Sequence, residues 1–154
     1  MSSNLVIITG DFKSRLAIPF ITGGIKAGFP SPAQDYMSDS LDFNHDIIRH
    51  PESTFYARVK GDSMIDAGIC DGDIVVVDRS IEAVHGDIIV AYIDGELTIK
   101  YLDLAHKEDG YILLVPANKH YEPIKLFVSD PLVIWGVVAW TIKKRPGNNT
   151  QELP

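Results

Sequence analysis

The sequence is poor in cysteine, in positive charge and in long apolar runs, and each shortage excludes a class of protein. Cys70 is the one cysteine among 154 residues, so the chain can form neither an internal disulfide nor a cysteine-based metal site. Lys and Arg number 14 against 21 Asp and Glu, for a net charge of -7, whereas direct nucleic-acid binding rests on clustered basic residues. No apolar run approaches the ~18 to 20 residues that span a bilayer. We therefore expect a soluble, cytoplasmic protein, with Cys70 as a small core residue.

Motifs for metal and phosphate binding are missing as well. Neither GxxxxGK[ST] nor GxGxxG occurs, and the histidines show no HxxxH or HExxH spacing. The five histidines are His45, His50, His85, His106 and His120. We expect no metal ion and no cofactor.

What the sequence does contain is a β-rich part that begins near residue 50. Runs rich in Val, Ile, Tyr and Phe predict strands over Thr54–Lys60, Asp73–Asp78, Asp87–Asp94, Glu96–Leu102, Tyr111–Pro116 and Leu132–Lys143. Asp-Gly and His-Gly dipeptides separate them, and Asp94-Gly95 between two apolar runs is typical of a hairpin turn. Short strands at this spacing predict a compact all-β sheet or a partly closed barrel.

The first 50 residues have a different sequence pattern, with short apolar stretches and many turn-forming residues. The turn-rich run Gly28–Pro32 contains two prolines, which prevent a continuous helix there and favour an extended path. A short helix could run from Ser31 through Met37 before residues 39–44 interrupt it. The tail from Arg145 onward is polar, and we expect it to be flexible.

Ser63 is a candidate nucleophile. It lies in the turn Gly61-Asp62-Ser63-Met64, directly after a predicted strand. A serine in such a turn can be held with its hydroxyl accessible and neighbouring backbone N–H groups pointing the same way, as a nucleophile and an oxyanion hole require. A Gly-x-Ser turn without any chemistry fits the same residues, and no histidine has a spacing that identifies it as a base.

Lys100 is the other candidate, as a general base. Period-two alternation places it on one strand face with Thr98 and Leu102, and places Leu97, Ile99 and Tyr101 on the other face. A lysine acts as a base only when neutral, and neutralising one at pH ~7.4 from a pKa of ~10.4 costs about 4 kcal/mol. Only apolar burial would make Lys100 competent. A lysine that reaches solvent from a sheet edge fits the same pattern.

Taken together, these motifs resemble a known family. Several runs are similar, in order and spacing, to the self-cleaving serine peptidase domain of LexA-type repressors and UmuD-like proteins: Val59–Asp66, Gly72-Asp73, His85–Ile88 and Asp94–Lys100. The run Ala27–Tyr36 is similar specifically to the UmuD-like branch. The resemblance covers residues 16–143 of the chain.

The resemblance implies a role for each candidate residue. Ser63 corresponds to the family's nucleophile and Lys100 to its general base. The backbone N–H groups of Ser63 and Asp62 would form the oxyanion hole, and Ala27-Gly28 would be the scissile bond. Some members have Cys before the scissile glycine, whereas Ala27 matches the LexA-type site.

The resemblance also implies a mainly β, LexA/UmuD-like fold, in which compact antiparallel sheets form a partly closed barrel with an extended N-terminal arm. The boundaries we expect are a removable arm (1–27), an extended linker with room for a short helix (28–50), a Ser-Lys peptidase-like β domain (51–144) and a flexible tail (145–154). The arm carries a charge of +2 and no helix-turn-helix pattern, so we expect no DNA-binding domain of the repressor type.

Partners follow from the resemblance alone. It implies a homodimer, SOS-induced cleavage promoted by the RecA filament on single-stranded DNA, and assembly of the processed form with UmuC as error-prone translesion DNA polymerase V. It implies no membrane and no direct sequence-specific nucleic-acid binding. Three alternatives stay open: an inactive binding or regulatory subunit of the same fold, a LexA-type regulator lacking its DNA-binding domain, and a signal-peptidase-like enzyme, which would need a membrane anchor.

Overall fold

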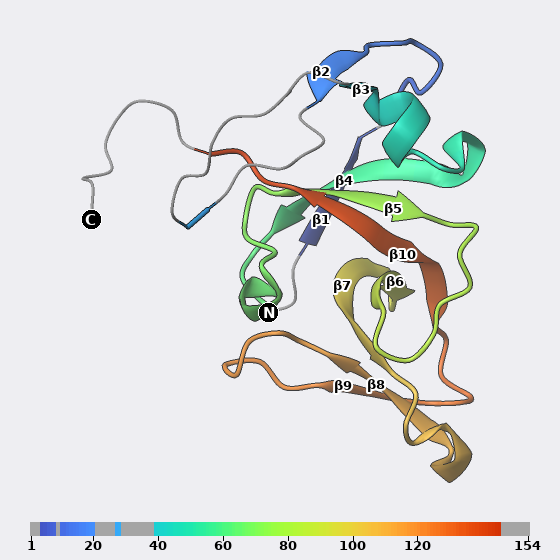
Figure 1. The fold of residues 1–154 in the computed structure, drawn as a ribbon. Coiled ribbons are helices and arrows are strands. Elements are labelled where there is room, and N and C mark those ends of the chain that lie inside the picture. Colours follow the sequence, from blue (N-terminus) through green and yellow to red (C-terminus); the bar gives the residue numbers. More distant parts are fainter. Residues whose placement is uncertain (1–3, 9, 21–26, 29–38, 146–154) are drawn as a thin grey trace. The chain divides into compact units, whose positions relative to one another are not determined.

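The computed structural model of the chain describes residues 4–8, 10–20, 27–28 and 39–145 (Figure 1). The chain divides into two units: residues 10–52, here called the short unit, and residues 1–9 with 53–154, here called the β unit. Within the described residues, no helix is long and apolar enough to cross a lipid bilayer. The predicted helix from Ser31 through Met37 and the predicted tail beyond Arg145 lie outside the described residues.

The β unit is built on one eight-stranded antiparallel sheet. Its strands are β1 (Asn4–Ile8), β4 (Thr54–Lys60), β5 (Ile74–Asp78), β6 (Ile88–Ile93), β7 (Glu96–Asp103), β8 (Tyr111–Val115), β9 (Ile124–Phe127) and β10 (Val133–Ile142). Their order across the sheet is β1-β4-β5-β10-β6-β7-β8-β9, and the sheet curls into a half-barrel (Figure 1). The prediction of a mainly β fold with a partly closed barrel is confirmed.

All six predicted strands are present, and each end lies within one residue of its expected position. β1 and β9 were not predicted. β9 has four residues, Ile-Lys-Leu-Phe, too few to establish an alternating pattern. β1 pairs with β4 from Asn4 opposite Lys60 to Ile8 opposite Tyr56, so the start of the predicted removable arm forms part of the main sheet. Removal of the arm stays a prediction.

The hairpin between β6 and β7 forms as its turn sequence predicts. Asp94 and Gly95 have φ angles of 49° and 85°, and they join the paired residues Ile93 and Glu96. Two consecutive residues with positive φ match the twist of the flanking strands, and Asp-Gly adopts that conformation readily. The hairpin fixes the register of β7 and therefore the position of Lys100.

The inner strands β6 and β7 are buried on both faces, because residues on opposite faces of each strand enter different cores. In β6, Val90 belongs to one hydrophobic cluster, whereas Ile89 and Ala91 belong to the other. In β7, Ile99 enters the first cluster and Leu102 the second. A strand covered on both faces can place a polar side chain out of contact with water.

β10 crosses the centre of the sheet between β5 and β6, and glycine allows its close approach to β5. A Cβ atom on Gly136 would lie 2.8 Å from Val77 Cγ1 and 2.9 Å from the Asp78 carbonyl oxygen. The register of β10 shifts on both sides of this point, between Ile134 and Gly136 and between Val138 and Trp140. Such shifts increase the local bend of a strand.

The expectation that Cys70 is a core residue is wrong, since its side chain is only partly buried. Cys70 lies in the loop between η3, the 3-10 turn Ile65–Ala67, and β5. Its N–H donates to Asp73 Oδ2 at 2.9 Å, and the same carboxylate pairs with Lys143. The loop is held both by these polar contacts and by its neighbour Ile69, which is 2% exposed and packs in the first hydrophobic cluster.

The short unit contains the two-stranded sheet of β2 (Ile18–Phe20) and β3 (Asp39–Leu41), followed by a π-helical turn, η1 (Phe43–Ile47). Along the chain, the 3-10 turn η2 (Pro51–Ser53) spans the boundary between the two units. The carboxylate of Asp42 caps η1 by accepting the Asn44 N–H at 3.0 Å. The sequence did not predict this helical turn.

Candidate active site

A tight turn after β4 carries Ser63. The chain leaves the strand through Gly61, whose φ of 92° lies in the region that glycine adopts without strain. The Gly61 N–H donates to Asp71 Oδ1 at 2.8 Å, and the Ile65 N–H donates to the Asp62 carbonyl oxygen at 3.3 Å. Hydrogen bonds on both sides of Ser63 therefore fix the path of the backbone.

Burial fixes the turn further. Ser63 is 0% exposed, and the next side chain, that of Met64, belongs to the first hydrophobic cluster together with Val59 of β4 and Ile99 of β7. Moving the turn would therefore pull a buried methionine out of the core, at a cost of about 2 to 5 kcal/mol if its packing were lost. Ser63 is held in place by the packing of its neighbour. The turn is present as predicted, but the expectation of an accessible hydroxyl is wrong, because the packing that fixes the turn also buries Ser63.

Lys100 lies on β7, between β6 and β8, and is 2% exposed. Its Nζ donates to Ser63 Oγ at 3.1 Å, to Thr98 Oγ1 at 2.8 Å and to the Ile99 carbonyl oxygen at 3.0 Å. The alternative of a lysine that reaches solvent from a sheet edge is therefore wrong. The predicted sharing of one strand face by Thr98 and Lys100 is confirmed by their direct contact.

Burial lowers the pKa of Lys100 from 10.5 to about 8, because desolvation disfavours the ammonium form. The partners of the amine are two hydroxyl oxygens and a carbonyl oxygen, and these neutral groups compensate less for lost water than a carboxylate would. At pH 7.4 a pKa of about 8 leaves roughly one side chain in five neutral, against roughly one in a thousand at 10.5. Lys100 is thus poised to lose its proton near neutral pH.

The neutral amine would face Ser63 with its lone pair. An –NH2 group has two N–H donors, and the Thr98 hydroxyl and the Ile99 carbonyl oxygen can accept both of them. The third direction, toward Ser63 Oγ at 3.1 Å, then holds the lone pair and can accept the serine proton. This is the geometry that a general base and a nucleophile need.

Two residues that the sequence did not single out contact the turn. Asn118 Nδ2 donates to the Asp62 carbonyl oxygen at 2.9 Å, and the Tyr121 hydroxyl donates to Asp62 Oδ1. They follow β8 and lie 56 and 59 positions from Asp62 in the chain. No local pattern in a single sequence connects residues so far apart.

The predicted cleavage site, Ala27-Gly28, lies in the short unit. Both residues are exposed, and a Cβ atom on Gly28 would meet nothing within 4 Å. Such an open stretch of backbone suits a segment that has to enter an active site. Its role as the scissile bond stays a prediction.

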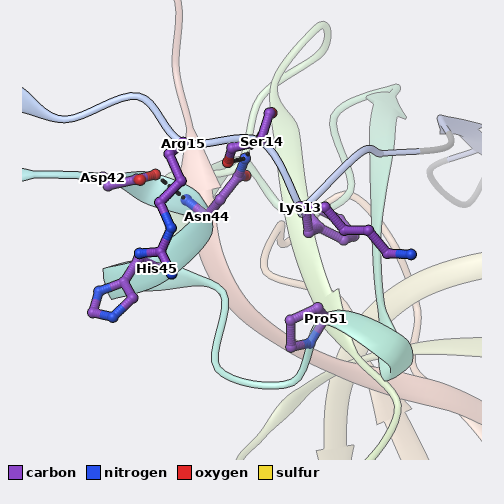
Figure 2. A pocket seen from close by; sticks show the side chains of 8 residues that line it. Lys13, Ser14, Arg15, Asp42, Asn44, His45 and Pro51 are labelled. Atoms are coloured by element: carbon purple, nitrogen blue, oxygen red, sulfur yellow. Dashed lines mark hydrogen bonds between the residues drawn. The ribbon is translucent and has the colours of Figure 1, made fainter.

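The other polar clusters do not have this arrangement. In the described residues, no group of three or more His, Cys, Asp or Glu side chains could hold a metal ion. A pocket of about 320 Å³ in the short unit is lined by Phe12, Lys13, Ser14, Arg15, Asp42, Asn44, His45 and Pro51 (Figure 2). Asn44 Nδ2 donates to the carbonyl oxygen of Ser14 at 2.7 Å, and Asp42 accepts backbone N–H groups, so these polar groups serve local structure.

The curled antiparallel sheet thus places a buried serine in hydrogen-bond contact with a buried lysine. The same pair of side chains occurs in Ser-Lys variants of the serine-peptidase triad, in which lysine takes the place of histidine. A sequence profile of the family described as Peptidase S24-like matches residues 19–139. The chain belongs to this family of serine peptidases. The matched span contains Ser63, Lys100 and the predicted cleavage site.

Curated relatives resemble the chain over most of its length. MucA of Salmonella typhimurium is 42% identical over 134 residues, which are 84% of this chain and 87% of MucA. SamA of Salmonella typhimurium is 42% identical over 126 residues, 82% of this chain and 85% of SamA. The LexA repressor of Clostridium perfringens is 40% identical over 120 residues, 78% of this chain but 57% of the repressor.

Proposed function

We propose that the chain is a self-cleaving serine peptidase of the UmuD-like branch, with Ser63 as the nucleophile and Lys100 as the general base. The observation that carries the proposal is the 3.1 Å separation of Lys100 Nζ and Ser63 Oγ, both on buried side chains. Membership of the Peptidase S24-like family and the similarity to MucA and SamA support it.

The first step forms an ester. The segment around Ala27-Gly28 enters the site, neutral Lys100 takes the proton of Ser63, and Oγ attacks the carbonyl carbon of Ala27. The N–H groups of Ser63 and Asp62 stabilise the negative oxygen of the tetrahedral intermediate. When the intermediate collapses, the bond to the Gly28 nitrogen breaks, and Lys100 returns its proton to that nitrogen.

The second step hydrolyses the ester. Lys100, neutral again, takes a proton from a water molecule as that water attacks the Ala27 carbonyl carbon. Breaking the bond to Oγ releases the carboxyl group of Ala27, and the proton returns to Ser63. The products are an arm of 27 residues and a remainder of 127 residues.

Cleavage in the cell would depend on how often the scissile segment occupies the site. We propose that the RecA filament on single-stranded DNA promotes this arrangement during the SOS response, in the cytoplasm. The processed homodimer then joins UmuC as the accessory subunit of translesion DNA polymerase V. The net charge of -7 fits a protein that reaches DNA through its partners.

Mass spectrometry of the purified chain after incubation at alkaline pH tests the proposal. We expect two pieces whose masses place the cut between Ala27 and Gly28, and an uncut chain when Ser63→Ala or Lys100→Ala is incubated in the same way. Equal cutting by Ser63→Ala would rule out the proposed nucleophile. A wild-type chain that stays whole at alkaline pH, and also with activated RecA, would favour an inactive regulatory subunit of the same fold.

A further inference from the structure

A side chain from a distant loop holds the carbonyl group that directly precedes Ser63. Asn118 Nδ2 donates to the Asp62 carbonyl oxygen at 2.9 Å. The Oδ1 atom of the same amide accepts the His120 N–H at 2.9 Å, so the loop itself determines which end of the amide faces Asp62. The donor is therefore oriented independently of the turn that it contacts.

Peptide geometry transmits this contact to Ser63. The carbonyl oxygen of Asp62 and the N–H of Ser63 belong to one planar trans peptide group and point in opposite directions. A donor that fixes the direction of the carbonyl oxygen also fixes the direction of the N–H. That N–H is one of the two proposed oxyanion donors, so the hydrogen bond from Asn118 to the Asp62 carbonyl oxygen also sets the direction of this donor.

Two further contacts tie the same loop, residues 117–121, to the turn. The Tyr121 hydroxyl donates to Asp62 Oδ1, and the hydrogen bond to this carboxylate raises the pKa of Tyr121, so the hydroxyl keeps its proton. After Ser63, the Asp66 N–H donates to the Ala117 carbonyl oxygen at 2.8 Å. The loop thus holds the turn on both sides of the nucleophile.

The turn alone holds its carbonyl group less firmly. Within the turn, the Asp62 carbonyl oxygen accepts the Ile65 N–H at 3.3 Å, a longer contact than the 2.9 Å to Asn118. Asp62 is exposed, so water competes for its polar groups. Without Asn118, the peptide group between Asp62 and Ser63 could rotate more freely. The Ser63 N–H would then point less often toward the position that the oxyanion occupies.

We propose that Asn118 is a positioning residue for the oxyanion hole: it fixes the peptide group between Asp62 and Ser63, and Tyr121 supports it through the Asp62 carboxylate. This inference rests on the proposed self-cleavage and concerns the same site. Because Asn118 acts on the oxyanion donor, it should change the maximal rate of cleavage and leave the pH midpoint set by Lys100 unchanged.

The test compares first-order rates of self-cleavage across pH 6 to 10 in four chains: wild type, Asn118→Ala, Asn118→Asp and Lys119→Ala. Asn118→Asp keeps the oxygen that accepts the His120 N–H and replaces the donor with a carboxylate oxygen. Lys119→Ala is the matched control, since Lys119 is an exposed neighbour in the same loop. Thermal unfolding of each variant in a Ser63→Ala background shows whether it folds.

Removing an oxyanion donor outright costs roughly 100- to 1,000-fold in rate, so misaiming one should cost about 10-fold or more. For Asn118→Ala we expect a plateau rate about 10-fold or more below that of the wild type, with an unchanged pH midpoint. Asn118→Asp should lose more of the plateau rate, and Lys119→Ala should lose none. A folded Asn118→Ala and a folded Asn118→Asp that both cleave at the wild-type plateau rate would overturn the inference and leave the proposed function intact. A loss produced only by a shifted midpoint would also overturn it. A wild-type chain that does not cleave would overturn both.

Discussion

The amine of Lys100 and the hydroxyl of Ser63 lie 3.1 Å apart, although 37 positions separate the two residues in the chain. The turn after β4 supplies one, the interior strand β7 supplies the other, and both side chains are buried. Burial lowers the pKa of Lys100 from 10.5 to about 8. The same burial reduces the free energy of unfolding by about 3 kcal/mol when the amine is protonated, because the ammonium group loses its water on folding. The same desolvation therefore prepares the base for catalysis and opposes stability.

Replacing Lys100 with methionine should stabilise the chain most at low pH. Below pH 8 the amine is protonated in both the folded and the unfolded state, so the desolvation penalty is fully present in Lys100. Between pH 8 and 10.5 only the unfolded state binds the proton, so the stability of the Lys100 chain rises with pH. The advantage of Lys100→Met should shrink by about 2 kcal/mol from pH 7 to pH 9.5.

Urea unfolding of the two chains at both pH values measures this change, with Ser63→Ala in each to prevent cleavage. Subtracting the free energy of unfolding of one chain from that of the other removes the contributions of groups that titrate equally in both chains. A stability difference that is the same at pH 7 and pH 9.5 would contradict a lowered pKa of Lys100.

Replacing Thr98 with valine should change two measurable quantities: the midpoint of the pH–rate profile, which reports the pKa of Lys100, and the plateau rate, which reports the orientation of its neutral amine. Thr98 Oγ1 accepts a hydrogen bond from Lys100 Nζ at 2.8 Å, and losing this acceptor costs the ammonium more than the neutral amine. The midpoint of the pH–rate profile should therefore fall below 8. The plateau rate should fall as well, by about 10-fold, because the amine loses one of the bonds that direct its lone pair to Ser63.

Thr98→Ser is the matched variant, since it keeps the hydroxyl and loses only a methyl group. We expect its midpoint and plateau rate to stay close to those of the wild type. Equal plateau rates in Thr98→Val and Thr98→Ser would show that the hydroxyl does not orient the amine.

Gly136→Ala should destabilise the β unit by about 1 to 3 kcal/mol. The new Cβ would lie 2.8 Å from Val77 Cγ1 and 2.9 Å from the Asp78 carbonyl oxygen, so β10 or β5 would have to move. Urea denaturation measures the loss. Gly28→Ala is the control, because its Cβ would meet nothing within 4 Å. Equal stability of the two variants would disprove the close approach.

The parts of the site that could be predicted from the sequence depend on local rules. Strand alternation places Thr98 and Lys100 on one face, and Asp94-Gly95 forms the hairpin turn that sets their register. The burial of Lys100 is not local, because it depends on β6 and β8 on either side and on the turn that carries Ser63. Period-two alternation alone fits a buried lysine and a solvated one equally well.

The contacts to Asp62 could not be predicted in this way. Asn118 and Tyr121 lie in a loop, where neither period nor turn chemistry specifies a distant partner. Their position follows from the pairing of β8 with β7 and from the curl of the sheet. Long-range hydrogen bonds of this kind become visible only when the whole sheet is assembled.

The pH dependence of the first-order rate of self-cleavage tests the central claim, that neutral Lys100 activates Ser63, most directly. Below the pKa the neutral fraction rises tenfold per pH unit, so the rate should rise with a slope of one on a logarithmic scale and level off above about pH 8. Mass spectrometry at each pH should place the cut between Ala27 and Gly28. A cleavage rate that does not change between pH 6 and pH 8 would contradict activation of Ser63 by neutral Lys100. A Lys100→Ala chain that cleaves as fast as the wild type would contradict it as well.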